Sequence, residues 1–209
     1  MSSIEWCERY VNQQLNDNRW FNEPINTFSN IVYLISVYKT RNMSHNFLSL
    51  YSSLLMVLTC FGSICFHGSG TRIGQLLDEI PIVLLCDSYI KLLDTNEGFS
   101  QNRLYEYYVA LLTIIYIITN QYMIFLTVVT SQGVALAYFV LEKNIKYKKK
   151  AYNRAFMVFI FGKVLWEYER YLYRNNECPQ EGLLIYLHGG WHVSTAVMHY
   201  YIIEETTTY

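Results

Sequence analysis

Two long stretches without charged side chains constrain this sequence more than any other feature. No Lys, Arg, Asp or Glu occurs within residues 42–71 or within residues 107–141. About 20 apolar residues are enough to cross a bilayer as an α-helix. The first stretch therefore predicts one membrane span at about residues 47–66, and the second predicts two spans divided near residues 119–121.

Four further segments combine apolar runs with a few polar or charged groups. They lie at about residues 25–39, 75–93, 153–172 and 182–203. Hydropathy alone is equally compatible with buried helices of a soluble protein at these four places. Together with the three charge-free spans, they predict an all-α fold, an integral membrane bundle of seven transmembrane helices, as a single domain over residues 1–209.

Basic residues between the spans predict how the bundle is oriented. The loop after the fifth span, "EKNIKYKKKAYNR", carries six Lys or Arg side chains, and the loop after the first span carries Lys39 and Arg41. An excess of basic residues marks cytosolic loops. We therefore expect a lumenal or extracellular N-terminus and a cytosolic C-terminus. Residues 1–23 contain no apolar core, and we expect them to lie at the membrane interface.

Two cysteines fall on the outer side in this topology. Cys7 lies in the N-terminal segment, and Cys178 lies in the loop before the last span. If the outer side is an oxidising lumen, the two thiols can pair and tie these segments together. A disulfide is one hypothesis, and two free thiols are the alternative.

The same topology brings histidines from two spans to a similar depth. In "HGGWH" at residues 188–192, His188 and His192 stand four residues apart, so both rings project from one face of a helix. His67 stands at the outer end of the second span. Three imidazoles with an open position for water form the arrangement of catalytic rather than structural zinc sites. The sequence thus predicts a zinc centre at His67, His188 and His192.

Two further polar residues are predicted beside this metal. Ser63 precedes His67 by one helical turn, and Asp78 lies in the first part of the third span. A carboxylate inside a membrane span is costly and usually functional, and Asp78 can accept a proton or orient a ligand. Glu79 points about 100° away around the helix and is the weaker candidate. The alternative for all these groups is a hydrogen-bond network between helices without a metal.

Five short motifs occur in an order and spacing that resemble a known family. They are "WCE" at 6–8, "EPINTFSN" at 23–30, "SICFH" at 63–67, "QLLDEIP" at 75–81 and "HGGWH" at 188–192. The set resembles the alkaline ceramidases, seven-span zinc-dependent amidases of the superfamily that includes the adiponectin receptors.

The resemblance implies an activity and a role for each candidate residue. It implies that zinc held by the three histidines hydrolyses the N-acyl amide of ceramide to sphingosine and a fatty acid. Asp78 would transfer the proton, and Ser63 would stabilise the carbonyl oxygen. The implied partners are a lipid substrate and a membrane, that of the endoplasmic reticulum or Golgi, and no nucleic acid.

The resemblance also implies a calcium site in the N-terminal segment. Its ligands would be oxygen atoms, which calcium prefers, from Glu5, Glu8, Glu23 and the carbonyl of Trp6. Tyr10 stands where the family pattern has Asn, with Asn12 as an alternative ligand, and Arg9 adds a positive charge to the cluster. The alternative is that these acidic residues only cap an interfacial helix.

Two other functions are compatible with the same residues. One is a receptor or regulator similar to the adiponectin receptor branch, with a zinc centre and little turnover. The N-terminal "WCE" segment and the outside N-terminus favour the hydrolase over this receptor. The other is a structural membrane protein without any metal.

Overall fold

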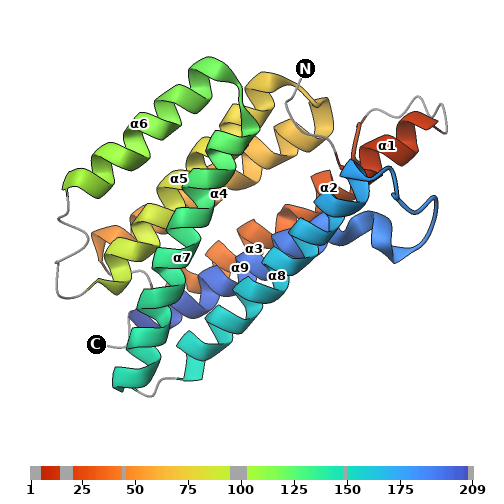
Figure 1. Ribbon diagram of the computed structural model, residues 1–209. Coiled ribbons are helices and arrows are strands. Elements are labelled where there is room, and N and C mark those ends of the chain that lie inside the picture. Colours follow the sequence, from red (N-terminus) through yellow and green to blue (C-terminus); the bar gives the residue numbers. More distant parts are fainter. Residues whose placement is uncertain (1–5, 15–20, 44–45, 95–102, 148–149, 207–209) are drawn as a thin grey trace.

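The computed structural model describes residues 6–14, 21–43, 46–94, 103–147 and 150–206, and within these ranges every regular element is a helix (Figure 1). The elements are α1 (Cys7–Gln14), α2 (Pro24–Ser29), α3 (Ile31–Thr40), α4 (Phe47–Ser69), α5 (Arg72–Leu93), α6 (Arg103–Thr119), α7 (Tyr122–Tyr147), α8 (Lys150–Arg174), the 3-10 helix η1 (Leu183–Tyr186) and α9 (Leu187–Thr206). The all-α prediction is confirmed for this part of the chain.

The helices correspond to the predicted spans with one difference. The first predicted span consists of two helices, α2 and α3, which meet at Asn30. The break predicted at 119–121 is present, with Asn120 at a φ of 57° between α6 and α7. By length and composition, two of the described helices are able to cross a membrane, over Phe47–Ser69 and Tyr122–Glu142. The seven-span bundle therefore stays a prediction.

A tight turn joins α4 to α5 and sets the geometry of the site. Gly70 ends α4 at a φ of 63°, the left-handed conformation that glycine adopts without strain, and its N–H donates to the carbonyl of Phe66 at 2.7 Å. The Thr71 hydroxyl then accepts from the N–H of Gly74 at 3.2 Å and caps α5. The chain thus reverses within the segment "GSGT".

Past this turn the two helices run in very close contact. A Cβ atom on Gly62 would lie 2.0 Å from the carbonyl oxygen of Leu77, so only glycine allows this approach. The neighbours of these two residues in the chain are Ser63 and Asp78. The close crossing of α4 and α5 therefore brings the predicted catalytic serine and aspartate to the same level.

The short helix α1 lies beside the end of α8, far from the C-terminal end of α9 (Figure 1). Trp6, Cys7, Glu8 and Arg9 are all buried. The hypothesised disulfide between Cys7 and Cys178 is present and fixes α1 to the loop that follows α8. The described part of the N-terminal segment therefore packs against one end of the bundle through its buried side chains.

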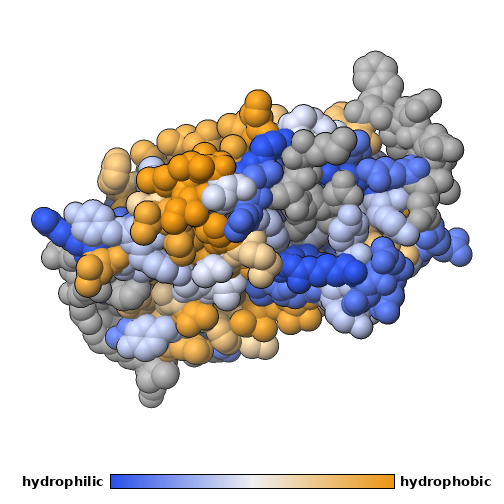
Figure 2. All heavy atoms as spheres, turned by 45° about the horizontal axis from the view of Figure 1, so that its top comes forward, coloured by the Kyte–Doolittle hydropathy of each residue, from blue (hydrophilic) through white to orange (hydrophobic). Residues whose placement is uncertain are grey.

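Large apolar side chains are exposed along the outside of the long helices. On α4 they recur every three or four residues, at Phe47, Leu50, Leu54, Leu58 and Phe61. Figure 2 shows hydrophobic residues gathered over the middle of one face of the molecule, with hydrophilic residues toward its two ends. An apolar surface of this extent is unusual for a protein surrounded by water.

Candidate metal centre and active site

Three buried histidines from α4 and α9 converge inside the bundle. The ligand atoms of His67, His188 and His192 all lie within 4.8 Å of one another. Among the described residues, no other group of three or more His, Cys, Asp or Glu side chains is close enough to hold one metal ion. The structure thus brings together the three residues that the sequence singled out as zinc ligands.

The hydrogen bonds of His67 fix which of its ring nitrogens is free. Its Nδ1 atom lies 2.6 Å from Oε2 of Glu23, and because an ionised carboxylate only accepts, Nδ1 carries the proton. The Nε2 atom is buried and has no hydrogen-bond partner among the described residues. A carboxylate behind a histidine is the usual way to orient a metal-binding ring.

His192 is held in the same way by a serine. The Ser29 hydroxyl donates to the carbonyl of Asn26 at 2.9 Å, so it accepts from Nδ1 of His192 at 2.7 Å. This leaves the Nε2 lone pair of His192 for a ligand.

The ring of His188 packs against the Trp6 indole with 3.9 Å between ring centroids. Its Nδ1 atom is buried and unpartnered within the described part of the chain. Three oriented imidazoles with unused nitrogen atoms fit the donor set of a zinc ion. The presence of zinc stays a prediction.

Ser63 and Asp78 lie together beside the histidines. Both side chains are buried, and the Ser63 hydroxyl forms a hydrogen bond with the Asp78 carboxyl group. The other oxygen of this carboxyl group, Oδ1, has no hydrogen-bond partner among the described residues. Asp78, His188 and His192 line one cavity. A carboxyl group with one unused oxygen therefore borders the same space as two of the imidazoles.

Glu79 is engaged elsewhere, although it adjoins Asp78 in the sequence. Its carboxyl group accepts from Nε2 of Gln75 at 3.0 Å and from the hydroxyl of Tyr116 on α6. Glu79 also lines the histidine cavity beside Asp78, and it differs from Asp78 in that both of its carboxylate oxygens accept hydrogen bonds.

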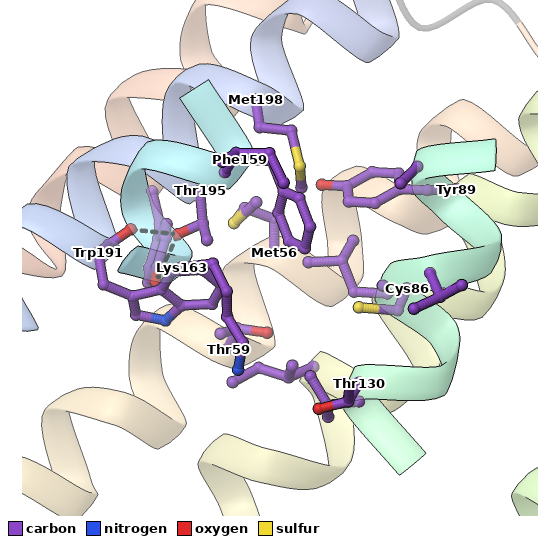
Figure 3. Close-up of a pocket in the computed structure, with 18 residues that line it drawn as sticks. Met56, Thr59, Cys86, Tyr89, Thr130, Phe159, Lys163, Trp191, Thr195 and Met198 are labelled. Carbon is purple, nitrogen blue, oxygen red and sulfur yellow. Dashed lines mark hydrogen bonds between the residues drawn. The ribbon is translucent and has the colours of Figure 1, made fainter. Parts of the chain in front are cut away.

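A larger apolar cavity of about 230 Å³ adjoins the histidine cavity. The two cavities share four lining residues, Tyr33, Ile82, Val129 and Trp191. Met56, Tyr89, Phe159 and Met198 are among the other residues that line it (Figure 3). The histidine cluster thus lies at one end of a space suited to hydrocarbon.

The predicted calcium ligands have other partners. Both carboxylate oxygens of Glu8 accept backbone N–H groups at the start of α2, from Ile25 at 2.7 Å and Asn26 at 2.9 Å. The Trp6 carbonyl accepts from the N–H of Tyr10 at 3.1 Å, and Glu5 lies outside the described residues. Glu8 thus acts as a cap that joins α1 to α2.

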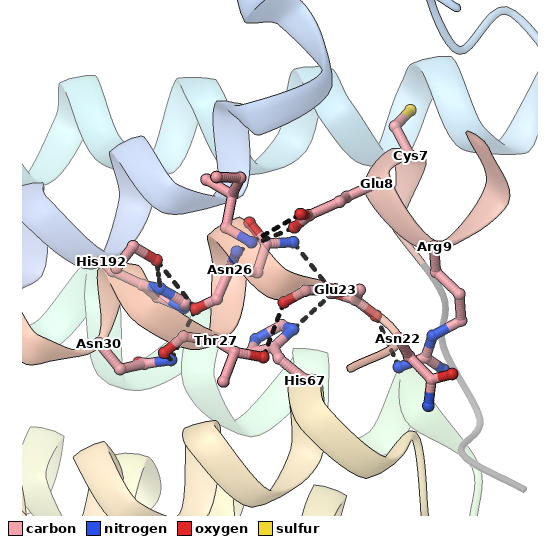
Figure 4. A network of polar contacts seen from close by, with 12 residues as sticks. Cys7, Glu8, Arg9, Asn22, Glu23, Asn26, Thr27, Asn30, His67 and His192 are labelled. Carbon is pink, nitrogen blue, oxygen red and sulfur yellow. Dashed lines mark hydrogen bonds and ion pairs between the residues drawn. The ribbon is translucent and has the colours of Figure 1, made fainter. Parts of the chain in front are cut away.

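Glu23 is the centre of a second set of contacts (Figure 4). Its Oε1 atom lies 2.6 Å from Nη2 of Arg9, and its Oε2 atom accepts from His67 and from Nδ2 of Asn26 at 2.9 Å. Burial raises the pKa of Glu23, but the contacts that its carboxylate makes with His67, Arg9 and Asn26 outweigh this cost and hold the pKa below its ordinary value. With a guanidinium already on Glu23, the described residues do not fit a calcium ion.

Sequence reasoning missed three residues that hold the site together. Glu23 supports His67, and Ser29 supports His192. Glu169 on α8 is fully buried and accepts the backbone N–H of Cys7 at 3.1 Å and that of His188. The first two residues belong to the motif "EPINTFSN", which carried the family resemblance without revealing what its side chains do.

The fold and the site define a class of protein: an all-helical bundle with a buried three-histidine centre that opens on an apolar cavity. The family model described as Ceramidase matches residues 1–208, so the chain belongs to the ceramidase family. It is also 24% identical over 223 residues to "Alkaline ceramidase 3" of Mus musculus, an alignment that covers 95% of this chain and 80% of that protein.

Proposed function

We propose that this protein is a zinc-dependent ceramide amidohydrolase, which releases sphingosine and a free fatty acid. The observation that carries the proposal is the convergence of three imidazoles beside Asp78 at the end of an apolar cavity. Membership of the ceramidase family and similarity to a mouse alkaline ceramidase support ceramide as the substrate.

In this proposal His67, His188 and His192 hold the zinc ion. A zinc ion bound there would lower the pKa of a water molecule to about 7 and polarise the amide carbonyl of the substrate. Glu23 and Ser29 keep two of the rings in the tautomer that leaves Nε2 free.

Asp78 is the proton carrier of the reaction. Its unpartnered oxygen lies in the cavity of the histidines, where it can take a proton from the attacking water and give it to the departing amine. The Ser63 hydroxyl donates to Asp78 while the carboxylate is ionised. Once Asp78 is protonated, this hydroxyl is released to stabilise the carbonyl oxygen as it gains negative charge.

The apolar cavity receives a hydrocarbon chain of the substrate. Its lining joins the histidine cavity at Tyr33 and Trp191, so a lipid amide at the histidines would extend one chain toward Met56 and Met198. Burial of that chain positions the amide for attack.

We further propose that α2 with α3, and each of α4 to α9, cross an endoplasmic reticulum or Golgi membrane as seven spans. The exposed apolar side chains along these helices are the surface that hydrocarbon would cover. The Cys7–Cys178 disulfide supports a lumenal location for α1, because such bonds form in oxidising compartments.

The experiment compares the purified wild type with His192→Ala. The wild type should contain one zinc ion per chain and release fatty acid from a fluorescent ceramide, and His192→Ala should lose both. His199→Gln is the matched control, because His199 is equally buried on α9 but pairs with Tyr89 at 2.7 Å. It should keep both zinc and turnover.

Each other outcome points to a different function. Zinc without turnover in the wild type would favour a receptor-like role, and a wild type without zinc would favour a structural protein. Equal fatty acid release by the wild type and His192→Ala would refute the catalytic assignment.

A further inference from the structure

We propose that the Arg9 side chain is the resident cation of the N-terminal segment, and that this protein therefore needs no calcium ion there. The proposal concerns the contacts of Arg9, Glu23 and Glu8, and it does not depend on the reaction proposed above.

Arg9 and Glu23 form a buried ion pair. The guanidinium and the carboxylate lie 2.6 Å apart, and their exposed fractions are 4% and 0%. The guanidinium also stands over the ring of Phe66, 5.7 Å from its centroid. Removal of one partner from an ion pair shielded from water in this way is costly, because the remaining charge stays buried with less compensation.

The Arg9–Glu23 pair occupies the place of the calcium ion that the family resemblance implies. A calcium ion requires six to eight oxygen ligands, commonly with several carboxylates. Glu23 directs one oxygen at Arg9 and the other at His67 and Asn26, and both oxygens of Glu8 cap α2. A cation next to Glu23 would also meet the positive charge of Arg9 at close range.

The positive charge of Arg9 compensates the negative charge of Glu23. Glu23 must stay ionised and correctly placed to accept the Nδ1 proton of His67. Arg9 supplies the compensating positive charge from α1, and the Cys7–Cys178 disulfide fixes α1 in position. The side chain thus performs, within the chain, the task that a bound divalent ion would perform.

The test measures calcium binding and thermal stability of the purified full-length protein. We expect the wild type to bind no radioactive calcium in equilibrium dialysis at millimolar free calcium, and to show the same Tm with a calcium chelator as with excess calcium. A bound calcium ion, or a Tm that falls when calcium is chelated, would overturn the proposal even if no variant can be purified.

Arg9→Gln tests the role of the charge itself. Loss of one partner of a buried pair should lower the Tm by about 10 °C, and Arg9→Lys should recover part of this loss because it keeps the charge. If Arg9→Gln melts at the wild-type temperature, Arg9 is not the cation that stabilises this segment.

Arg170→Gln is the matched control. Arg170 is as buried as Arg9 and pairs with Glu167 at 2.8 Å, but Glu167 is 45% exposed. We expect a smaller fall in Tm, since a partner in contact with water keeps its hydration when the arginine is lost.

Discussion

The histidine cluster and the acidic N-terminal segment were both predicted to bind metals, and their side chains differ in one respect. At the histidines, one ring nitrogen of His67 and one of His188 is buried without a hydrogen-bond partner among the described residues. At the acidic segment, both Glu8 oxygens accept backbone N–H groups and Oε2 of Glu23 accepts from His67. Oε1 of Glu23 makes no hydrogen bond among the described residues, but it lies 2.6 Å from the guanidinium of Arg9. Residue type alone indicates a metal site equally well in both places, and the positive charge of Arg9 separates them.

Among three variants that test this comparison, Asp78→Asn should have the largest effect, and that effect should be on turnover. The amide keeps the size of the side chain but cannot carry the proton, so fatty acid release should fall by about 10²–10⁴-fold. Zinc content should stay at the wild-type level, because Asp78 does not support a histidine ring through any contact described above. A zinc-free Asp78→Asn protein would show that this residue belongs to the metal centre itself.

Glu23→Gln tests the residue that the two regions share. It removes the negative charge behind His67 and the carboxylate with which Arg9 forms its ion pair, so zinc affinity should fall by about 10–100-fold, as measured by competition with a chelator. Glu8→Gln is the control, since the Glu8 carboxylate caps α2 at the N–H groups of Ile25 and Asn26. Glu8→Gln should lower the Tm and leave zinc affinity near the wild-type value. An equal loss of zinc affinity in both variants would show that the acidic segment as a whole, and not Glu23 alone, supports the metal centre.

Ser29→Ala should have the smallest effect of the three. His192 loses the acceptor for its Nδ1 proton, and zinc affinity should fall by about tenfold, the lower end of such effects. The control is Ser194→Ala, because the Ser194 hydroxyl donates only to the carbonyl of Gly190 within its own helix, at 2.9 Å. Chelator competition that does not distinguish the two alanine variants would mean that the His192 ring is held by packing alone.

Much of the site could be predicted because it depends on spacing within single helices. His188 and His192 share a face by their four-residue separation, and Ser63 precedes His67 by one turn. The turn at Gly70 then sets α4 against α5. The charge-free stretches predicted both of the described helices that are long and apolar enough to cross a membrane.

The contacts between elements could not be predicted in this way. Spacing defines which side chains share a face, but it does not say which donor from another helix reaches a given carboxylate. Arg9 was noted only as an unfavourable charge, and Glu23 was assigned to calcium rather than to His67. The contacts that Arg9 and Glu23 make in the structure depend on how α1 and α2 pack on the rest of the bundle.

The Cys7–Cys178 disulfide joins residues 171 positions apart and so closes most of the polypeptide into a covalent ring. The residue before Cys7 is Trp6, whose indole supports His188. Completion of the histidine centre is therefore coupled to oxidative maturation. A chain synthesised in a reducing host cell would lack this closure, and the choice of expression system decides whether the ring is formed.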